Sequence, residues 1–498
     1  MLNIKGLSDS GGANGGSPGA VISYLQNTEQ GHVGRDGAYY STGYYSTGAP
    51  SQWHGTLATE MGLTGEIKTA DLECMLSGET PAGETFGAER AGNRRMGNDM
   101  TISAPKSISI QALAAGDETV IAAHDRAVGK AIEYIESNIV SARYGRNGIY
   151  SDKTHSMAAA VYRHEDARPV DGVVDPSLHS HVIAINVTRD SHGNLRSTDL
   201  DFGDRNIRME TADAIYKAAL AQELEAAGYQ TRRTQNGFEL ADITDEQIQS
   251  FSKRTSQIEA SDEYLNASTT GQRKSATLHT REGKGNDSRD ELRSKWRDAA
   301  ETAGVDATPH ESGTAALDTE DAISADVEYP ESESVSAEDQ AINDALEHLD
   351  ERDAVNNVEQ IYYHALRYGM GQVDPDTVKA RIDEREDLHQ TAAGIVSDST
   401  LIREDSVMAA IEQGRGSQDP ISNTDAAKQD VTAAEDSLGI EYTRDQRRAA
   451  VNALSSTDQI TGIVGAAGSG KTTVMKTIAD NARERGYEIV GLAPSAAA

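Results

Sequence analysis

The sequence predicts an α+β protein, an antiparallel sheet with packed helices, followed by the first part of an α/β domain. Two apolar runs, 157–162 and another beginning at Leu178, are separated by a loop rich in Asp and Pro, a pattern typical of two antiparallel strands. Residues 117–140 and 206–228 carry apolar side chains at helical spacing. Near residue 465 a glycine-rich loop lies between an expected strand and an expected helix.

Length and composition limit the class of protein. A chain of 498 residues is too long for one compact core, so we expect two or three domains. It has no long apolar run and no secretory signal pattern, which predicts a cytoplasmic protein without membrane insertion. The single cysteine excludes an internal disulfide. The net charge of −34 argues against a nucleic-acid partner, but most of the acidic excess lies downstream of residue 304.

The N-terminal region combines glycines with a dense group of tyrosines. The first twenty residues are rich in glycine, and we expect a flexible arm there. Packing or base stacking would explain any one tyrosine, but this density is unusual. The tyrosines are Tyr24, Tyr39, Tyr40, Tyr44 and Tyr45, the last four within the duplication YYSTGYYSTG.

Residues 53–113 are expected to contain helix and then strand. The segment 53–83 looks helical and amphipathic. Alternating apolar residues over 100–110 predict a strand that is interrupted at Pro105. Asp99 precedes this strand, as a cap or turn residue or as a carboxylate that orients a metal-bound histidine. Further along, we expect a helix over 117–140 with His124 on its apolar face.

Three histidines mark the centre of the expected sheet. His179 and His181 are two residues apart on one expected strand, so they project from the same face. His164 lies at the matching end of the partner strand. Three neutral imidazoles form a metal site with open positions, suited to polarising an oxygen of a substrate. The alternative is a structural role, because a His-x-His pair alone is common on sheet surfaces.

The C-terminal part contains a linker, a helical region and a phosphate-binding motif. Residues 305–345 are acidic and poor in large apolar residues, which predicts a disordered linker. Residues 346–435 favour helix without a catalytic signature. In residues 436–498, the motif GAAGSGKT follows an expected strand at 459–464 and precedes an expected helix at 473–485. Its phosphate-binding residues are Gly465, Gly468, Gly470, Lys471 and Thr472, with Thr472 as the magnesium ligand.

Four segments together resemble the MobF family of conjugative relaxases, the TrwC/TraI-like proteins. They are QWHGTLATEMGLTG, DMTISAPKSISIQAL, DPSLHSHVIAIN and IQSFSKRTSQI, in the family's order over about residues 1–304. YTRDQRRAAVNAL, which contains Gln446, and the P-loop resemble the opening motifs of superfamily 1 helicases. No acidic strand end for magnesium and no arginine finger follow by Ala498, so we expect a fragment of a longer relaxase-helicase.

The resemblance implies a fold and a reaction. The fold is an HUH-type palm, an antiparallel sheet carrying the histidines and covered by a mobile segment near 248–258. The reaction is metal-dependent, site- and strand-specific nicking of single-stranded DNA at a plasmid origin of transfer. A tyrosine attacks the phosphodiester and forms a 5′-phosphotyrosine, which a free 3′ hydroxyl can reverse. Relaxosome accessory proteins and a type IV secretion coupling protein are the implied protein partners.

The resemblance also assigns residues. The cofactor is Mg²⁺ or Mn²⁺, or another transition metal, on His164, His179 and His181, with ATP-Mg at the P-loop of the longer parent chain. Tyr24 is the expected nucleophile, although Leu25 stands where the family has a second tyrosine. Tyr44 and Tyr45 match the second tyrosine pair, which the family uses in a second strand transfer, while Tyr39 and Tyr40 resemble an insertion that could take either role. Asp99 matches the family's aspartate, which orients a histidine or helps to take the tyrosine proton. The candidate phosphate contacts are Arg94, Arg95 and Lys106.

Two other functions are compatible with the sequence. The three histidines would also suit a hydrolytic or redox metalloenzyme that acts on a small molecule, with incidental tyrosines. Alternatively, the chain is a P-loop ATPase or helicase fragment with a non-catalytic DNA-binding N-terminal domain. Neither alternative predicts a covalent protein-DNA adduct.

Overall fold

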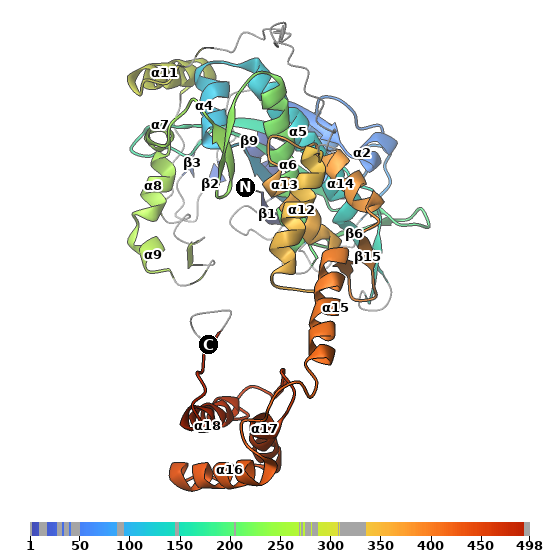
Figure 1. Ribbon diagram of the computed structural model, residues 1–498. Helices are drawn as coiled ribbons and strands as arrows, with labels where there is room; N and C mark the ends of the chain where they lie inside the picture. The colour runs from blue at the N-terminus through green and yellow to red at the C-terminus, as the bar shows by residue number, and fades with distance from the viewer. Residues whose placement is uncertain are drawn as a thin grey trace, which may run out of the picture. The chain divides into compact units, whose positions relative to one another are not determined.

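The computed structural model describes residues 2–8, 17–26, 32–33, 39–40, 50–86, 94–144, 149–203, 206–267, 269, 272–273, 280, 287–306, 308 and 335–492. The chain forms two compact units, which are described separately (Figure 1). The first unit is Met1–Glu386 with Thr391–Ile395. The second unit is Asp387–Gln390 with Val396–Ala498.

A five-stranded antiparallel sheet forms the centre of the first unit, in the order β1-β5-β9-β8-β4. The two expected histidine strands are present as adjacent antiparallel neighbours, β8 and β9. The N-terminal residues do not form the expected flexible arm over their whole length, because β1 pairs with β5 and buries Leu7. The strands are β1 (Asn3–Ser8), β4 (Ser51–His54), β5 (Arg95–Ser103), β8 (Ala159–Asp166) and β9 (Pro176–Ile185).

Helices pack on both faces of this sheet, and side chains that alternate along β9 divide the two hydrophobic cores (Figure 1). Leu178 and Val182 face the larger core, under α4, α5 and α6. Ile183 and Ile185 face the smaller core, together with α1, α2 and α3. The helices are α1 (Pro18–Gln26), α2 (Thr56–Glu60), α3 (Thr69–Ser77), α4 (Lys106–Ala114), α5 (Glu118–Asn138) and α6 (Ile207–Ala226).

The expected strand over 100–110 is wrong beyond Ser103. Pro105 caps a helix instead, and Ile108 and Ile110 belong to α4. All residues of α4 from Ser107 to Ala114 are buried, so its sequence lacks the polar stripe that identifies a surface helix. The expected helix over 53–83 is also wrong at its start, because Trp53 lies on the edge strand β4. The expected helix over 117–140 is confirmed as α5, with Asp117 as its N-cap.

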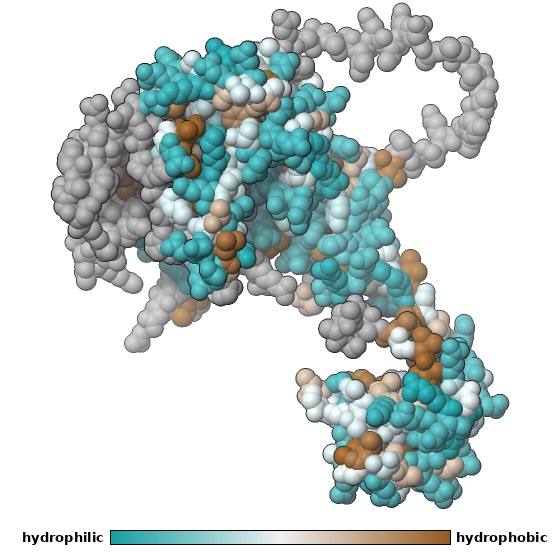
Figure 2. Space-filling view, turned by 90° about the vertical axis from the view of Figure 1, so that its left-hand side faces the viewer, coloured by the Kyte–Doolittle hydropathy of each residue, from teal (hydrophilic) through white to brown (hydrophobic). Residues whose placement is uncertain are grey.

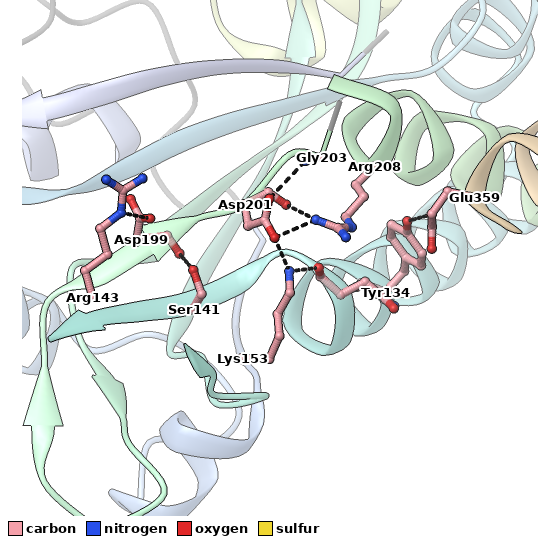
Figure 3. A network of polar contacts seen from close by, with 10 residues as sticks. Tyr134, Ser141, Arg143, Lys153, Asp199, Asp201, Gly203, Arg208 and Glu359 are labelled. Atoms are coloured by element: carbon pink, nitrogen blue, oxygen red, sulfur yellow. Dashed lines mark hydrogen bonds and ion pairs between the residues drawn. The ribbon is translucent and has the colours of Figure 1, made fainter. Parts of the chain in front are cut away.

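A smaller antiparallel sheet, β12-β6-β7, lies beside α5 and α6. Figure 3 shows the polar network that joins it to these helices. Lys153 and Arg208 both pair with Asp201, with N–O distances of 3.0 and 2.6 Å. The strands of this sheet are β6 (Val140–Tyr144), β7 (Tyr150–Lys153) and β12 (Thr198–Leu200).

Several short elements complete this part of the chain. The expected turn and strand at 235–240 is confirmed as a hairpin that contacts α4 and α6. The strands are β2 (His32–Val33) with β3 (Tyr39–Tyr40), β10 (Thr188–Arg189) with β11 (Leu195–Arg196), and β13 (Thr231–Thr234) with β14 (Gly237–Leu240). The helices are α7 (Asp245–Ser250), α8 (Lys253–Glu259), α9 (Asp262–Leu265) and α11 (Arg289–Thr302).

Three further helices of the first unit extend this packing: α13 packs on α6, and α12 packs on α13 and α14 (Figure 1). They are α12 (Ala337–Asp350), α13 (Val358–Tyr368) and α14 (Pro375–Glu384). Thus α12 begins inside the segment expected to be a linker, most of which lies outside the described residues. The helical region expected over 346–435 is divided between the two units, since only its beginning packs on the first unit.

The second unit contains four helices in its described part. They are α15 (Asp398–Gln413), α16 (Thr424–Leu438), α17 (Arg444–Ser455) and α18 (Lys471–Glu484), and the ribbon β15 (Leu388–Gln390) with β16 (Ile395–Ser397) precedes them. The expected strand at 459–464 is not formed, and Val464 is fully exposed. A P-loop strand is stabilised by neighbouring strands, and no described strand pairs with this segment.

Hydrophilic residues cover most of the face seen in Figure 2, and the hydrophobic residues on it form small separate patches. Among the described helices, none combines the length and the apolar character that crossing a bilayer requires.

Candidate metal centre

The three predicted histidines converge on one face of the central sheet. His164 on β8 is directly opposite His179 on β9, and His181 is opposite Tyr162. One ligand nitrogen from each ring lies within 4.8 Å of the others. His164 and His181 are buried, and His179 is partly exposed. Within the described ranges, no other group of three His, Cys, Asp or Glu residues has this geometry.

Each imidazole is oriented by an oxygen atom at one of its nitrogens. The Nδ1 atom of His181 lies 2.7 Å from Oδ1 of Asp99, which is buried. Nδ1 of His179 lies 2.8 Å from the Ser177 carbonyl oxygen, and Nε2 of His164 lies 3.1 Å from the Leu25 carbonyl oxygen. Because a carbonyl oxygen only accepts hydrogen bonds, these two histidine nitrogens carry the proton. Their other nitrogens therefore keep the lone pair that a metal requires.

Electrostatics favour the neutral, ligating form of His179. The pKa of His179 is lowered to about 4, mainly by burial and also by the nearby His181, against smaller opposing effects of the Ser177 carbonyl and Asp99. His179 is therefore uncharged near pH 7 without a metal. Three imidazoles with oriented nitrogens fit a divalent ion that retains open coordination positions.

The helix that carries Tyr24 lies next to this cluster. Leu25 is completely buried in the smaller core, and its carbonyl oxygen is the acceptor for His164. Tyr24 immediately precedes Leu25 in α1, so its backbone lies one residue from the carbonyl group that accepts from His164. The side chain of Tyr24 lies outside the described residues, as do Tyr44 and Tyr45.

Buried carboxylates connect the loop end of the histidine hairpin, where β8 ends and β9 begins, to later helices. Glu165 pairs with Arg289 and Arg293 of α11. Asp175 accepts hydrogen bonds from the backbone nitrogen of Lys253 at 2.8 Å and from its Nζ at 2.9 Å. Sequence reasoning missed these residues, because their partners lie at least 78 positions away in the chain. The one indication in the sequence was that both carboxylates lie at or beside the ends of the strands that carry the histidines.

The three candidate phosphate contacts differ in their surroundings. Arg94 donates to the carbonyl oxygen of Leu76, and Arg95 is exposed and donates to Asn98. The Lys106 ammonium lies 2.9 Å from the carbonyl oxygen of Pro176. Burial lowers the pKa of Lys106, and its acidic neighbours only partly offset that effect. In this structure all three side chains donate to oxygen atoms of the protein.

A second polar cluster lies on the opposite face of β9. His124 of α5 is completely buried, with Nε2 at 2.9 Å from Oγ of Ser180 and Nδ1 at 2.7 Å from the hydroxyl of Tyr216. Burial is the main cause that lowers the pKa of His124 to about 3, so the ring is neutral. Sequence analysis placed His124 on an apolar helix face, and only the fold identifies its partners.

The P-loop residues of the second unit surround the Lys471 side chain. Its Nζ lies 2.6 Å from the Gly465 carbonyl oxygen and 2.8 Å from that of Ala466. Gly468 and Gly470 have φ angles of 75° and 78°, which favour glycine. Lys471 and Thr472 begin α18, two residues earlier than expected. Gln446 donates from Nε2 to the Ser469 carbonyl oxygen at 2.8 Å.

Two known families match separate parts of the chain, one within the first unit and one within the second. The TrwC relaxase family matches residues 18–303, and an AAA domain family matches residues 441–498. The multifunctional conjugation protein TraI of Escherichia coli is 28% identical over 372 residues, 71% of this chain and 20% of the relative. TraI of strain K12 is 30% identical over 212 residues, 40% of this chain and 12% of the relative. The chain therefore spans about a fifth or less of these relatives.

Solved structures of TrwC are similar to the first unit. The conjugative relaxase TrwC in complex with oriT DNA, in a metal-free structure, is 32% identical with a TM-score of 0.51. A metal-bound TrwC complex with oriT DNA has the same identity and TM-score. A third TrwC structure contains a 27-mer DNA comprising the recognition hairpin and the cleavage site, at 31% identity and a TM-score of 0.51. Each alignment covers 62% of this chain and 100% of the TrwC chain.

Proposed function

Because the chain belongs to the TrwC relaxase family, we propose that residues 1–304 nick and rejoin single-stranded DNA at a plasmid origin of transfer. The observation that carries this proposal is the histidine cluster beside the Tyr24 helix, joined to it by the contact between His164 and the Leu25 carbonyl. TrwC structures with oriT DNA support the choice of substrate. A cytoplasmic reaction is proposed, because a chain with a single cysteine is compatible with a reducing compartment.

The proposed reaction is a transesterification at phosphorus. The Tyr24 oxygen forms a bond to the scissile phosphate, the bond from phosphorus to the 3′ oxygen breaks, and that oxygen takes up a proton as the 3′ hydroxyl. The 5′ phosphate remains on the tyrosine, so no bond energy is lost to hydrolysis. A free 3′ hydroxyl later reverses the step. Tyr44 and Tyr45 are proposed to perform a second strand transfer.

The chain's own residues position the reacting groups. His164, His179 and His181 would hold a divalent metal, whose positive charge stabilises developing negative charge on phosphate oxygens. Asp99 fixes the orientation of the His181 ring through its Nδ1 atom. Arg94, Arg95 and Lys106 are proposed phosphate contacts, and Arg95 is the most exposed of the three. Mg²⁺, Mn²⁺ and other transition metals are the candidates for the ion.

A second function is proposed for residues 436–498. The P-loop around Lys471 and the match to the AAA domain family support nucleotide binding, with ATP-Mg as the proposed ligand. Helicase activity is proposed for a longer parent chain. Residues 305–345 are proposed as a linker, apart from the part that forms α12. Relaxosome accessory proteins and a type IV secretion coupling protein are proposed partners by family membership.

Covalent attachment to DNA tests the proposal directly. The chain is incubated with Mg²⁺ or Mn²⁺ and single-stranded oligonucleotides from the transfer origin of its own plasmid. We expect a slower protein band on a denaturing gel, because a phosphotyrosine bond survives denaturation. A chelator and Tyr24→Phe should each abolish this band, while Tyr45→Phe should retain it.

Two outcomes would change the assignment. If Tyr24→Phe still forms the adduct, a later tyrosine is the first nucleophile. If the folded, metal-loaded wild-type chain forms no adduct on any origin strand, the relaxase proposal is wrong. Binding of labelled ATP that Lys471→Ala removes would then favour the ATPase alternative.

A further inference from the structure

Ser180 interrupts an apolar row behind the metal centre. It lies between His179 and His181 on β9, and its side chain points to the opposite face of the sheet. The residues that share this face are Leu178, Val182 and Ala184, all buried in the larger core. Ser180 itself is only 1% exposed. A hydroxyl at this position needs a partner inside the protein.

That partner is His124, which joins three separate elements. Its Nε2 atom contacts Ser180 on β9, and its Nδ1 atom contacts Tyr216 on α6. The His124 and Tyr216 rings meet edge to face with centroids 5.6 Å apart. Because a neutral imidazole has one donor and one acceptor, the two hydroxyls satisfy both ring nitrogens. The strand between the two ligands is thereby linked to α5 and α6.

Simple burial does not explain this arrangement. Replacing hydrogen-bonded polar groups with apolar groups of the same shape can be nearly neutral for stability. Apolar side chains occupy the neighbouring positions on this face of β9. The hydrogen bonds between Ser180 and His124 and between His124 and Tyr216 add a preferred orientation, because a hydrogen bond weakens steeply when its donor–hydrogen–acceptor angle changes. A rotation of β9 about its axis would break the contact between Ser180 and His124.

We propose that Ser180, held by His124 and Tyr216, is a positioning residue that fixes the rotation of β9 and hence the placement of its ligands His179 and His181 relative to His164 on β8. This inference rests on the proposed function, because it assigns a role toward the metal of the relaxase centre. Ligand atoms must lie within about 0.5 Å of their productive positions. Ser180 is adjacent to both ligands, so a turn of its peptide units moves both imidazoles together.

Metal affinity tests this role without using DNA cleavage. The full chain is stripped with a chelator and titrated with Co²⁺, and its visible spectrum reports affinity and coordination geometry. We expect Ser180→Ala to weaken Co²⁺ binding about tenfold, the lower end of the effect known for groups that orient metal ligands, and to change the spectrum. Ser180→Thr keeps the hydroxyl and should restore most of the affinity.

Two further variants separate positioning from stability. Tyr216→Phe removes only a hydroxyl and should weaken Co²⁺ binding less than Ser180→Ala, because the contact between His124 and Ser180 remains. Thr211→Val is the matched control, since the Thr211 hydroxyl is buried on α6 and donates to the Ile207 carbonyl oxygen. It should lower the melting temperature without changing Co²⁺ affinity.

Each outcome decides the inference. An unchanged affinity and spectrum in folded Ser180→Ala would overturn it, as would an equal loss of affinity in Thr211→Val. A wild-type chain that binds no Co²⁺ would also overturn it. The adduct assay tests the relaxase proposal separately. A wild-type chain that binds Co²⁺ but forms no adduct contradicts the relaxase proposal. In that case the Co²⁺ affinities of the wild type and the variants still test the role of Ser180.

Discussion

At the scale of single residues, two kinds of buried histidine lie on opposite faces of β9. His179 is oriented by a carbonyl oxygen and faces two other imidazoles. His124 has hydroxyl partners at both nitrogens and therefore has no lone pair left for a metal. Burial lowers the pKa of both rings. The same residue type is thus a candidate ligand on one face and a structural link on the other, according to its neighbours.

Asp99→Asn should lower metal affinity about 10- to 100-fold, the range known for partners of metal-bound histidines. The amide of the variant lacks the negatively charged oxygen that accepts the hydrogen bond from Nδ1 of His181 and so orients the ring. Competition with a chromophoric chelator measures the affinity. The control is Asp201→Asn, which alters an ion-paired carboxylate in the network of Figure 3, outside the histidine cluster. An Asp99→Asn protein with wild-type affinity would refute this role.

The low pKa of His124 predicts a pH-dependent stability. Its folded pKa is about 3 and its ordinary value is 6.5, so between these values the unfolded chain binds more protons. Stability falls as pH decreases below about 6.5, by up to about 1.4 kcal/mol per pH unit. His124→Gln removes this contribution, so the stability difference between wild type and variant should shrink between pH 7 and 5. Urea unfolding of the metal-free proteins measures the free energy of unfolding at each pH. If the difference between wild type and variant is the same at pH 7 and pH 5, the prediction is wrong.

At the scale of elements, the β8-β9 hairpin is fixed by helices that follow it in the chain. Trp296 of α11 is buried in the larger core, and its Nε1 donates to the Val174 carbonyl oxygen at 2.8 Å. Glu165 and Asp175 add ion pairs to α11 and to Lys253, the first residue of α8. These contacts connect the segment that contains the IQSFSKRT block to the ends of the ligand strands.

Trp296→Ala should destabilise the first unit by about 3–5 kcal/mol, because it removes a large buried side chain and leaves a cavity. Trp296→Phe keeps most of the volume, loses the hydrogen bond to Val174, and should cost less, about 1–3 kcal/mol. Chemical unfolding monitored by circular dichroism provides both values. If the two substitutions cost the same, the packing of α11 is not what fixes the hairpin.

At the scale of the whole molecule, the first unit extends beyond the residues that match the relaxase family. The helices α12 to α14 continue it to Glu386, and α13 packs on α6. Polar contacts cross this boundary: Tyr134 donates to Glu359, as Figure 3 shows, and Lys130 pairs with Asp376 at 2.5 Å. The buried side chains of α13 include Ile361, Tyr362 and Leu366.

A fragment ending at residue 306 should therefore be less stable than one ending at residue 386, because the shorter fragment exposes the apolar surface of α6. A loss of about 2 kcal/mol would lower the melting temperature of a fragment of this size by about 3 °C. Differential scanning calorimetry of both fragments measures the difference. Equal melting temperatures would show that α12 to α14 contribute nothing to the relaxase unit.

The sequence alone determined the features that depend on local spacing. The period of two in β9 placed His179 and His181 on one face, and the apolar period of 117–140 defined α5. The expected strand over 106–110 failed because α4 is buried on all sides, which removes the polar positions that reveal a helical period.

Only the tertiary structure decided which distant residues meet. Glu165 and Arg289 are 124 positions apart, and His124 and Tyr216 are 92 apart. No local pattern encodes such pairs, because they depend on how helices pack across the sheet. The sequence therefore proposed the three candidate ligands and Asp99 as a carboxylate that orients one of them. The fold alone identified the carbonyl oxygens of Ser177 and Leu25 and the helices that hold the hairpin in place.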